Sequence, residues 1–129
     1  MEELIARVVA RTGLDPELAS KAVGIIFAFL QKEGPAEEVT KMFAALPGAE
    51  ALASANADSG GGGGLMGAIG VMMGGGGLMA LAGKLTGAGV GMGQMQALGN
   101  ELFAYGREKA GEDTMGAIVG AVPGLGQFV

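Results

Sequence analysis

Residues 39–48 read Val-Thr-Lys-Met-Phe-Ala-Ala-Leu-Pro-Gly, and residues 115–124 read Met-Gly-Ala-Ile-Val-Gly-Ala-Val-Pro-Gly. In both stretches apolar residues recur at positions i, i+3, i+4 and i+7, which is the pattern of a helix with one buried face. A Pro-Gly pair follows each pattern and predicts the end of that helix. The chain therefore carries the same helical element twice, which indicates an internal duplication.

Two more helices are predicted ahead of the first of these elements. An apolar stripe between Leu4 and Val9 predicts an amphipathic helix near the start of the chain. The triplet Asp15-Pro16-Glu17 then supplies an N-cap residue, a proline suited to the first helical position and an acid for the positive helix end. It predicts a central helix from Pro16 to Glu33. Residues 22–30 of that helix are all apolar, so we expect other helices to surround it.

The second copy repeats this order with weaker start signals. Residues 78–87 match the first helix, and a second central helix is predicted from Gln94 to Lys109. Glycines alternate through residues 89–93 where the first copy has its start triplet, so we expect this helix to begin late, near residue 93 or 94, and to be less stable. The predicted fold is all-α, with two pseudo-repeated three-helix modules packed through their central helices and joined by a glycine-rich segment.

The predicted organisation has a first helical module at 1–53, a Gly/Ala/Met-rich linker at 54–77 and a second helical module at 78–129, the two modules forming one core. No charged residue occurs from Ser59 to Gly83. Runs of glycine nevertheless break this stretch, and the apolar block at 65–73 is too short for a membrane-spanning helix. Two interpretations of the block stay open: it folds back onto the core, or it contacts an apolar partner or a membrane surface reversibly.

Composition argues against most catalytic chemistry. The 129 residues include neither Cys nor His, which removes thiolate ligands, the commonest metal ligand and every His-activated nucleophile. The pairs Glu37-Glu38 and Glu112-Asp113 fall in the first turns of predicted helices, where the helix dipole accounts for them without a metal. Gly83-Lys84-Leu85-Thr86 lacks the spacing of a phosphate-binding loop. We predict no enzyme, and no catalytic, cofactor-binding or metal-binding residues.

The charge of the chain bears on its partners. Thirteen acidic residues against eight basic ones give a formal net charge of −5, which disfavours nucleic acid. The N-terminal residues lack the basic and apolar regions of a secretory signal, so the expected location is the cytoplasm.

The predicted function is structural: self-association into a homo-oligomer, or binding of another protein, through apolar, glycine-rich helix surfaces. The methionines beside the glycines fit either an adaptable binding surface or ordinary core packing. The candidate interaction surface comprises Leu65, Met66, Ile69, Val71, Met72, Met73, Met92 and Met95. The alternative function is that of a carrier for a lipid or another hydrophobic ligand in a cavity between the modules, lined by Ile26, Phe29, Leu102 and Tyr105.

Several short motifs also carry a family resemblance. They are Arg11-Thr12-Gly13-Leu14, Ala22-Val23 in the central helix, Ala45-Leu46-Pro47-Gly48, and Ala121-Val122-Pro123-Gly124. With these motifs the chain resembles the small helical bacterial domains of the VcgC/VcgE-like group, present as two degenerate copies. The resemblance covers both modules and leaves out the glycine-rich middle. It implies an all-helical bacterial protein with no established activity.

Overall fold

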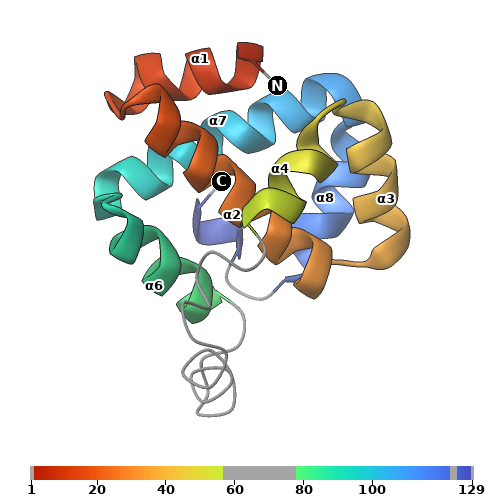
Figure 1. Cartoon of the computed structure of the whole chain (residues 1–129). Coiled ribbons are helices and arrows are strands. Elements are labelled where there is room, and N and C mark those ends of the chain that lie inside the picture. The colour runs from red at the N-terminus through yellow and green to blue at the C-terminus, as the bar shows by residue number, and fades with distance from the viewer. Residues whose placement is uncertain (1, 57–77, 123–124, 129) are drawn as a thin grey trace.

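The computed structural model describes residues 2–56, 78–122 and 125–128 (Figure 1). Over these ranges the chain forms seven α-helices, one 3-10 helix and no strand, so the predicted all-α class is confirmed there. The elements are α1 (Glu2–Thr12), α2 (Pro16–Glu33), α3 (Ala36–Ala45), α4 (Ala49–Asn56), α6 (Leu78–Ala88), α7 (Met92–Ala110), α8 (Glu112–Ala121) and η2 (Leu125–Phe128).

Helix α2 runs through the middle of the molecule, as its apolar sequence predicts. Phe27 and Leu30 are completely buried, and most other residues between positions 22 and 30 are buried too. Helices α1, α4 and α6 pack directly against α2. A helix whose middle is apolar on all sides can be stable in water only when neighbours cover it in this way.

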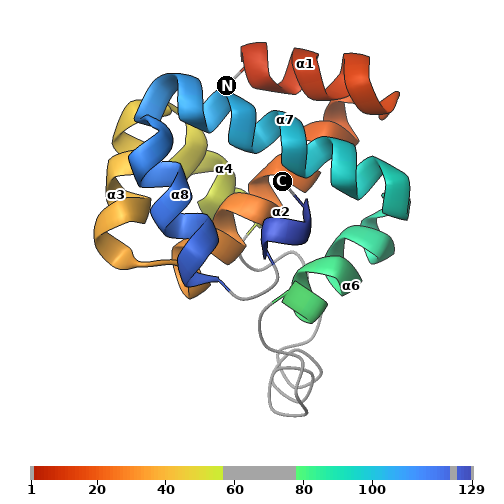
Figure 2. The same ribbon diagram turned by 180° about the vertical axis from the view of Figure 1, so that it is seen from behind.

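The contacts between the two halves of the chain are reciprocal. Helix α1 lies along α7, α6 lies against α2, and α3 packs on α7 and α8 (Figures 1 and 2). Each half thus lends its first helix to the long helix of the other half. The two long helices contribute side chains to the same core. The main contacts across the halves are nevertheless α1–α7, α6–α2, α3–α8 and α3–α7, and the α2–α7 pair is not among them.

The repeated stripes that predict the third helices do face inward. Val39 and Met42 of α3 are buried, as are Met115 and Ile118 of α8. Phe43, on the same stripe of α3, is partly buried and meets the ring of Phe27 edge-on, at 5.9 Å between centroids. These side chains join the halves of the chain into one apolar core.

The start of each long helix has its own chemistry. Asp15 occupies the N-cap position of α2, but its side chain makes no capping hydrogen bond, so the start depends on the extended backbone at Asp15 and the proline that follows. Helix α7 begins at Met92, slightly earlier than the glycines suggest. Gln94 explains the difference, because its Oε1 accepts a hydrogen bond from the backbone N–H of Gly91 at 2.9 Å.

Helix α4 is an element that the sequence analysis missed. The Leu46-Pro47-Gly48 turn ends α3, and Gly48 adopts φ +92°, a conformation that favours glycine. The chain then re-enters a helix whose residues Ala49 and Ala53 are fully buried. The predicted boundary at residue 53 therefore falls inside α4, and residues 54–56 are helical where a linker was expected. The rest of the predicted linker lies outside the described residues.

Candidate functional site: an apolar groove between α1, α2 and α4

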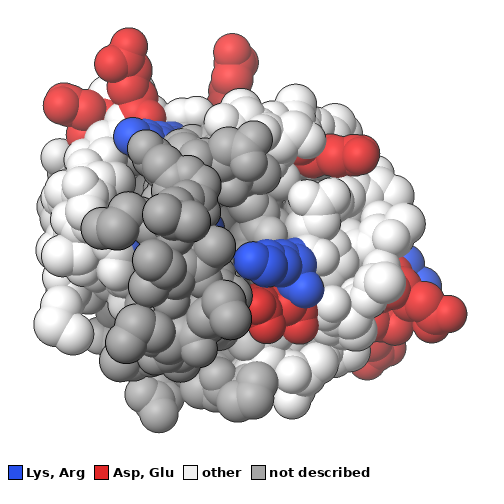
Figure 3. Space-filling view, turned by 60° about the horizontal axis from the view of Figure 1, so that its bottom comes forward, with Lys and Arg blue, Asp and Glu red and all other residues white. Residues whose placement is uncertain are grey.

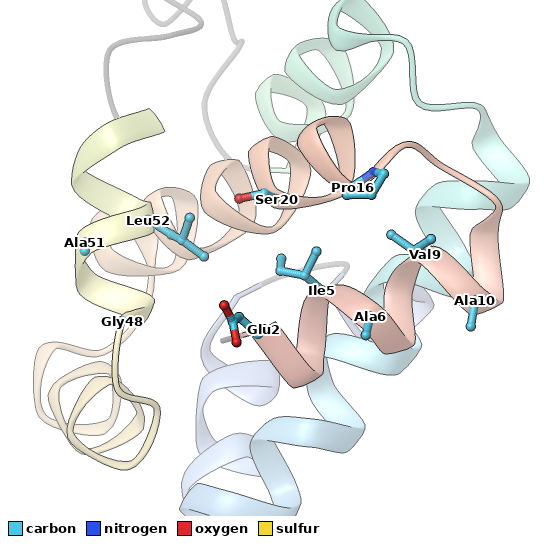
Figure 4. Close-up of a pocket in the computed structure, with 10 residues that line it drawn as sticks. All are labelled: Glu2, Ile5, Ala6, Val9, Ala10, Pro16, Ser20, Gly48, Ala51 and Leu52. Atoms are coloured by element: carbon cyan, nitrogen blue, oxygen red, sulfur yellow. The ribbon is translucent and has the colours of Figure 1, made fainter.

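An open groove of about 830 Å³ lies between α1, the first turns of α2, and α4 (Figure 4). Leu52 from α4 and Ile5 from α1 point toward the space between these helices, and Ser20 of α2 lies at its floor. Almost all of the lining is apolar. The described residues that line the groove are Glu2, Ile5, Ala6, Val9, Ala10, Pro16, Ser20, Gly48, Ala51 and Leu52.

Helix α1 can line the groove because it is apolar on two stripes. Leu4 and Val8 are completely buried in the core. Ile5 and Val9, one position later on the helix, are only partly buried and line the groove. Ile5 and Val9 therefore pack against the edge of the core with one side and line the groove with the other.

A third stripe of α1 carries its arginines, and these are bound to α7. The Arg7 guanidinium lies 2.6 Å from a Glu108 oxygen and 3.4 Å from Glu101, and Arg11 lies 3.1 Å from Glu101. The hydrogen bond to Glu108 raises the pKa of Arg7 above its ordinary value, with nearby carboxylates adding to the effect. The basic residues of α1 are therefore engaged with α7 and do not belong to the groove lining.

Helix α4 supplies the opposite wall. Its buried residues Ala49 and Ala53 fix it to the core, while Ala51, which is exposed, and Leu52, which is partly buried, line the groove. Together with Gly48, most of this wall consists of small side chains. Small residues let the backbone of a neighbouring helix approach closely.

The groove carries one ionisable group, Glu2, among its ten lining residues. None of the described lining residues carries a positive charge. On the face of the molecule in Figure 3, the visible Lys and Arg side chains of the described residues lie at separate places and do not form one basic patch.

A second, smaller hollow of about 330 Å³ lies beside α3. Its lining is more polar than that of the groove and comprises Gln31, Ala36, Val39, Thr40, Phe43, Ala44 and Glu50. Part of its wall is the core-facing stripe of α3, and Gln31 of α2 and Glu50 of α4 complete it.

The candidate interaction residues are placed as follows. Met92, at the start of α7, is 84% exposed, and Met95, one turn later, is 3% exposed and belongs to the core. Of these two methionines only Met92 is therefore available to a partner, because helix α7 turns Met95 inward. The other predicted surface residues, within 65–73, lie outside the described residues.

The residues predicted to line a cavity lie in the core. Ile26, Phe29, Leu102 and Tyr105 are all buried, and the groove is lined by a different set. Two cations lie over the Tyr105 ring, the Arg7 guanidinium 5.7 Å and the Lys109 ammonium 5.6 Å from its centroid.

The groove itself was not predicted from the sequence. Its signals in the sequence are Ile5 and Val9 of α1 and the small residues of α4, and small residues alone are also typical of a linker. Within the described ranges, no three carboxylates come together in a way that could hold a metal ion. No described helix has both the length and the apolarity needed to cross a bilayer.

Comparisons of the chain with protein-family models, with curated proteins and with solved structures find no match. The inference of function therefore depends on the residues and geometry of the chain itself.

Proposed function

We propose that this protein is a non-catalytic interaction module, which self-associates or binds another protein through apolar, small-residue helix surfaces. The observation that carries the proposal is the groove between α1, α2 and α4, whose lining is apolar apart from Glu2 and Ser20. Burying apolar surface contributes roughly 25 cal/mol per Å², so a chain segment that covers Ile5, Val9 and Leu52 would gain binding energy there. An exposed apolar surface of this kind is typical of interaction sites.

We also propose that the two halves of the chain are copies of one three-helix module. Helices α1, α2 and α3 have lengths of 11, 18 and 10 residues, and helices α6, α7 and α8 have lengths of 11, 19 and 10 residues. The exchange of α1 and α6 between the halves is also what an approximate twofold relation would produce. This pattern supports the pseudo-repeat, with the glycine-rich segment as the connection between its copies.

The test of this function uses variants at the groove floor. Ser20→Trp is expected to fill the groove, whereas Ser54→Trp introduces the same side chain on an exposed, non-lining position of α4. Sedimentation velocity over a wide concentration range would measure self-association of the full chain. A helical peptide library displayed on phage, selected against the wild type, would measure partner binding.

Under the proposal, self-association or peptide selection is lost in Ser20→Trp and kept in Ser54→Trp. A chain that stays monomeric at every concentration and selects no groove-dependent peptide would contradict the proposed function.

The alternative function, carriage of a lipid or other hydrophobic ligand, has weaker support. The groove is apolar, as a carrier requires, but it is open along one side (Figure 4). Ligand-carrying sites enclose most of the ligand surface. Lipid that co-purifies with the protein and is retained through gel filtration would favour this alternative.

Two further expectations remain predictions from the sequence. One is kinship with the VcgC/VcgE-like bacterial domains, which the repeated Leu-Pro-Gly and Val-Pro-Gly motifs suggest. The other is a cytoplasmic location. Neither is needed for the interaction function.

A further inference from the structure

Resting on the function proposed above, we propose that the groove receives an amphipathic helix of a different protein, with Lys or Arg placed where that helix meets Glu2. Of the two forms of that function, self-association and partner binding, partner binding is the one specified here, with a basic amphipathic helix as the partner. It depends on the charge of the lining, the shape of the groove and the positions of the basic residues of α1.

The charge of the groove favours a cationic partner. Glu2 is exposed and is the single ionisable residue of the lining. Arg7 and Arg11, the two cations of α1, are paired with Glu101 and Glu108 on α7. The helix N-terminus of α1 contributes a partial positive charge of about +0.5, which the carboxylates of Glu2 and Glu3 outweigh. A Lys or Arg of a partner would find an available carboxylate beside apolar surface.

The shape of the groove favours a helix over a lipid chain. Small residues, among them Ala6, Ala10 and Ala51, lie beside the larger Ile5 and Leu52. Such a surface accepts the ridge of large side chains along an apolar helix stripe, as in helix-in-groove recognition. A fatty acid in the same place would leave one side of its chain in water.

A second copy of this chain is a poorer occupant than a basic helix. Twofold pairing of the grooves would bring together two identical linings, each with the Glu2 carboxylate and neither with a cation. Like charges at an interface weaken association and select against that partner.

The experiment uses two labelled synthetic helical peptides and the full chain. Both peptides have the same Leu stripe at positions i, i+3, i+4 and i+7; one carries Lys and the other Glu at both ends of the stripe, so that binding direction does not matter. Fluorescence anisotropy measures their dissociation constants. We expect the Lys peptide to bind more tightly by about two- to fivefold, the range of an exposed ion pair.

Two charge reversals provide the matched comparison. Glu2→Lys is expected to reverse the order of the two peptides, while Glu50→Lys, which makes the same change of net charge outside the groove lining, is expected to keep it. Ser20→Trp should weaken both peptides by about tenfold or more. Ala6→Trp, at an exposed lining position of α1, provides a second block if Ser20→Trp lowers the thermal stability of the fold.

The outcomes separate this inference from the function on which it rests. If neither peptide binds and the chain stays monomeric at every concentration, or if both tryptophan variants bind the peptides as the wild type does, the interaction function of the groove fails. If the peptides bind in the groove but Glu2→Lys leaves their order unchanged, only the inferred partner chemistry is overturned. Displacement of both peptides from the groove by palmitate would overturn the basic helix in favour of a lipid. A dimer that Ser20→Trp abolishes would overturn it in favour of a second copy of this chain.

Discussion

Gly106 of α7 lies directly against Met115 of α8. A Cβ atom at Gly106 would come within 2.5 Å of the Met115 Cε and 2.8 Å of its Sδ, and Met115 is completely buried. Overpacking of this kind costs ~1–3 kcal/mol, and the better helix propensity of alanine returns ~1 kcal/mol. We therefore expect Gly106→Ala to lower the free energy of unfolding by about 1 kcal/mol, as measured by urea denaturation.

Gly116 of α8 provides the control for that substitution. It is exposed, and a Cβ built on it meets no atom within 4 Å. Gly116→Ala is expected to raise the free energy of unfolding, by up to about 1 kcal/mol, because only the helix propensity changes. Equal effects at the two glycines would show that the close approach of α7 to α8 is unimportant.

At Gly106 the sequence predicts helix propensity but does not predict tertiary contacts. A glycine within a helical pattern predicts a weaker helix, and the sequence gives that expectation for Gly106. The contact with Met115 depends on how α8 folds back on α7, which periodicity does not specify. Met92 and Met95 make a similar case: their spacing is compatible with one exposed surface, but the rotation of α7 exposes one and buries the other.

Gln94 joins two helices at once. Its Oε1 accepts a hydrogen bond from the Gly91 N–H, and its Nε2 donates one to the Thr12 carbonyl oxygen at 3.1 Å, at the end of α1. Each such bond contributes about 0.5–1.5 kcal/mol. We expect Gln94→Ala to lower the free energy of unfolding by about 1–2 kcal/mol, with both bonds lost.

Gln94→Glu separates the two roles. A carboxylate can still accept from Gly91, and it suits the positive end of α7, but it cannot donate to Thr12. Hydrogen exchange is expected to show increased opening at the end of α1 in Gln94→Glu, while the first turn of α7 stays protected. Loss of protection in both places would contradict the separation.

The ion pairs between α1 and α7 are expected to respond to salt. Arg11 is exposed and pairs at 3.1 Å with Glu101, whose side chain is 15% exposed. An ion pair with one exposed partner contributes about 0.2–1 kcal/mol. Arg11→Gln should reduce stability by that amount at low ionic strength and by less in about 1 M NaCl, where charges are screened within about 3 Å. The measurement is urea denaturation at the two salt concentrations.

Lys41→Gln is the matched control, because Lys41 pairs with Glu38 within α3 and connects no two helices. Its effect on hydrogen exchange of α1 should be absent, whereas Arg11→Gln should increase exchange there. An unchanged α1 in Arg11→Gln would mean that apolar contacts alone hold this helix.

Element prediction succeeded where local signals were strong. The start triplet and the long apolar run predict α2 with its observed bounds, Pro16 to Glu33. Helix α4 is not predicted, because its residues are mostly small and its pattern is weakly amphipathic. Considered alone, such a sequence resembles a linker. Its stability comes from packing Ala49 and Ala53 on α2, a tertiary effect that local sequence does not reveal.

The molecule as a whole is expected to fold as one unit. Because α1 packs on α7 and α6 on α2, each half lacks part of the surface that covers its own long helix. We expect the fragments 1–56 and 78–129 to be largely unfolded alone and to recover helix content when mixed, as followed by circular dichroism. A fragment 1–56 that melts cooperatively by itself would contradict this dependence.

The all-α class and the inward direction of the repeated stripes could be predicted because both follow from periodicity along the chain. The groove could not, since it arises where three helices from separate parts of the first half meet. Ile5 and Val9 were correctly placed on an amphipathic helix, yet which of its stripes faces α7 and which faces α4 is decided only by tertiary packing.

The absorption and fluorescence of Tyr105 report on the position of α1. The chain has one tyrosine and no tryptophan, so its near-ultraviolet absorption and intrinsic emission above those of phenylalanine come from this one ring. That ring is 5% exposed and lies beside Arg7 of α1. Detachment of the first helix from the rest of the molecule would thus be visible spectroscopically without any label.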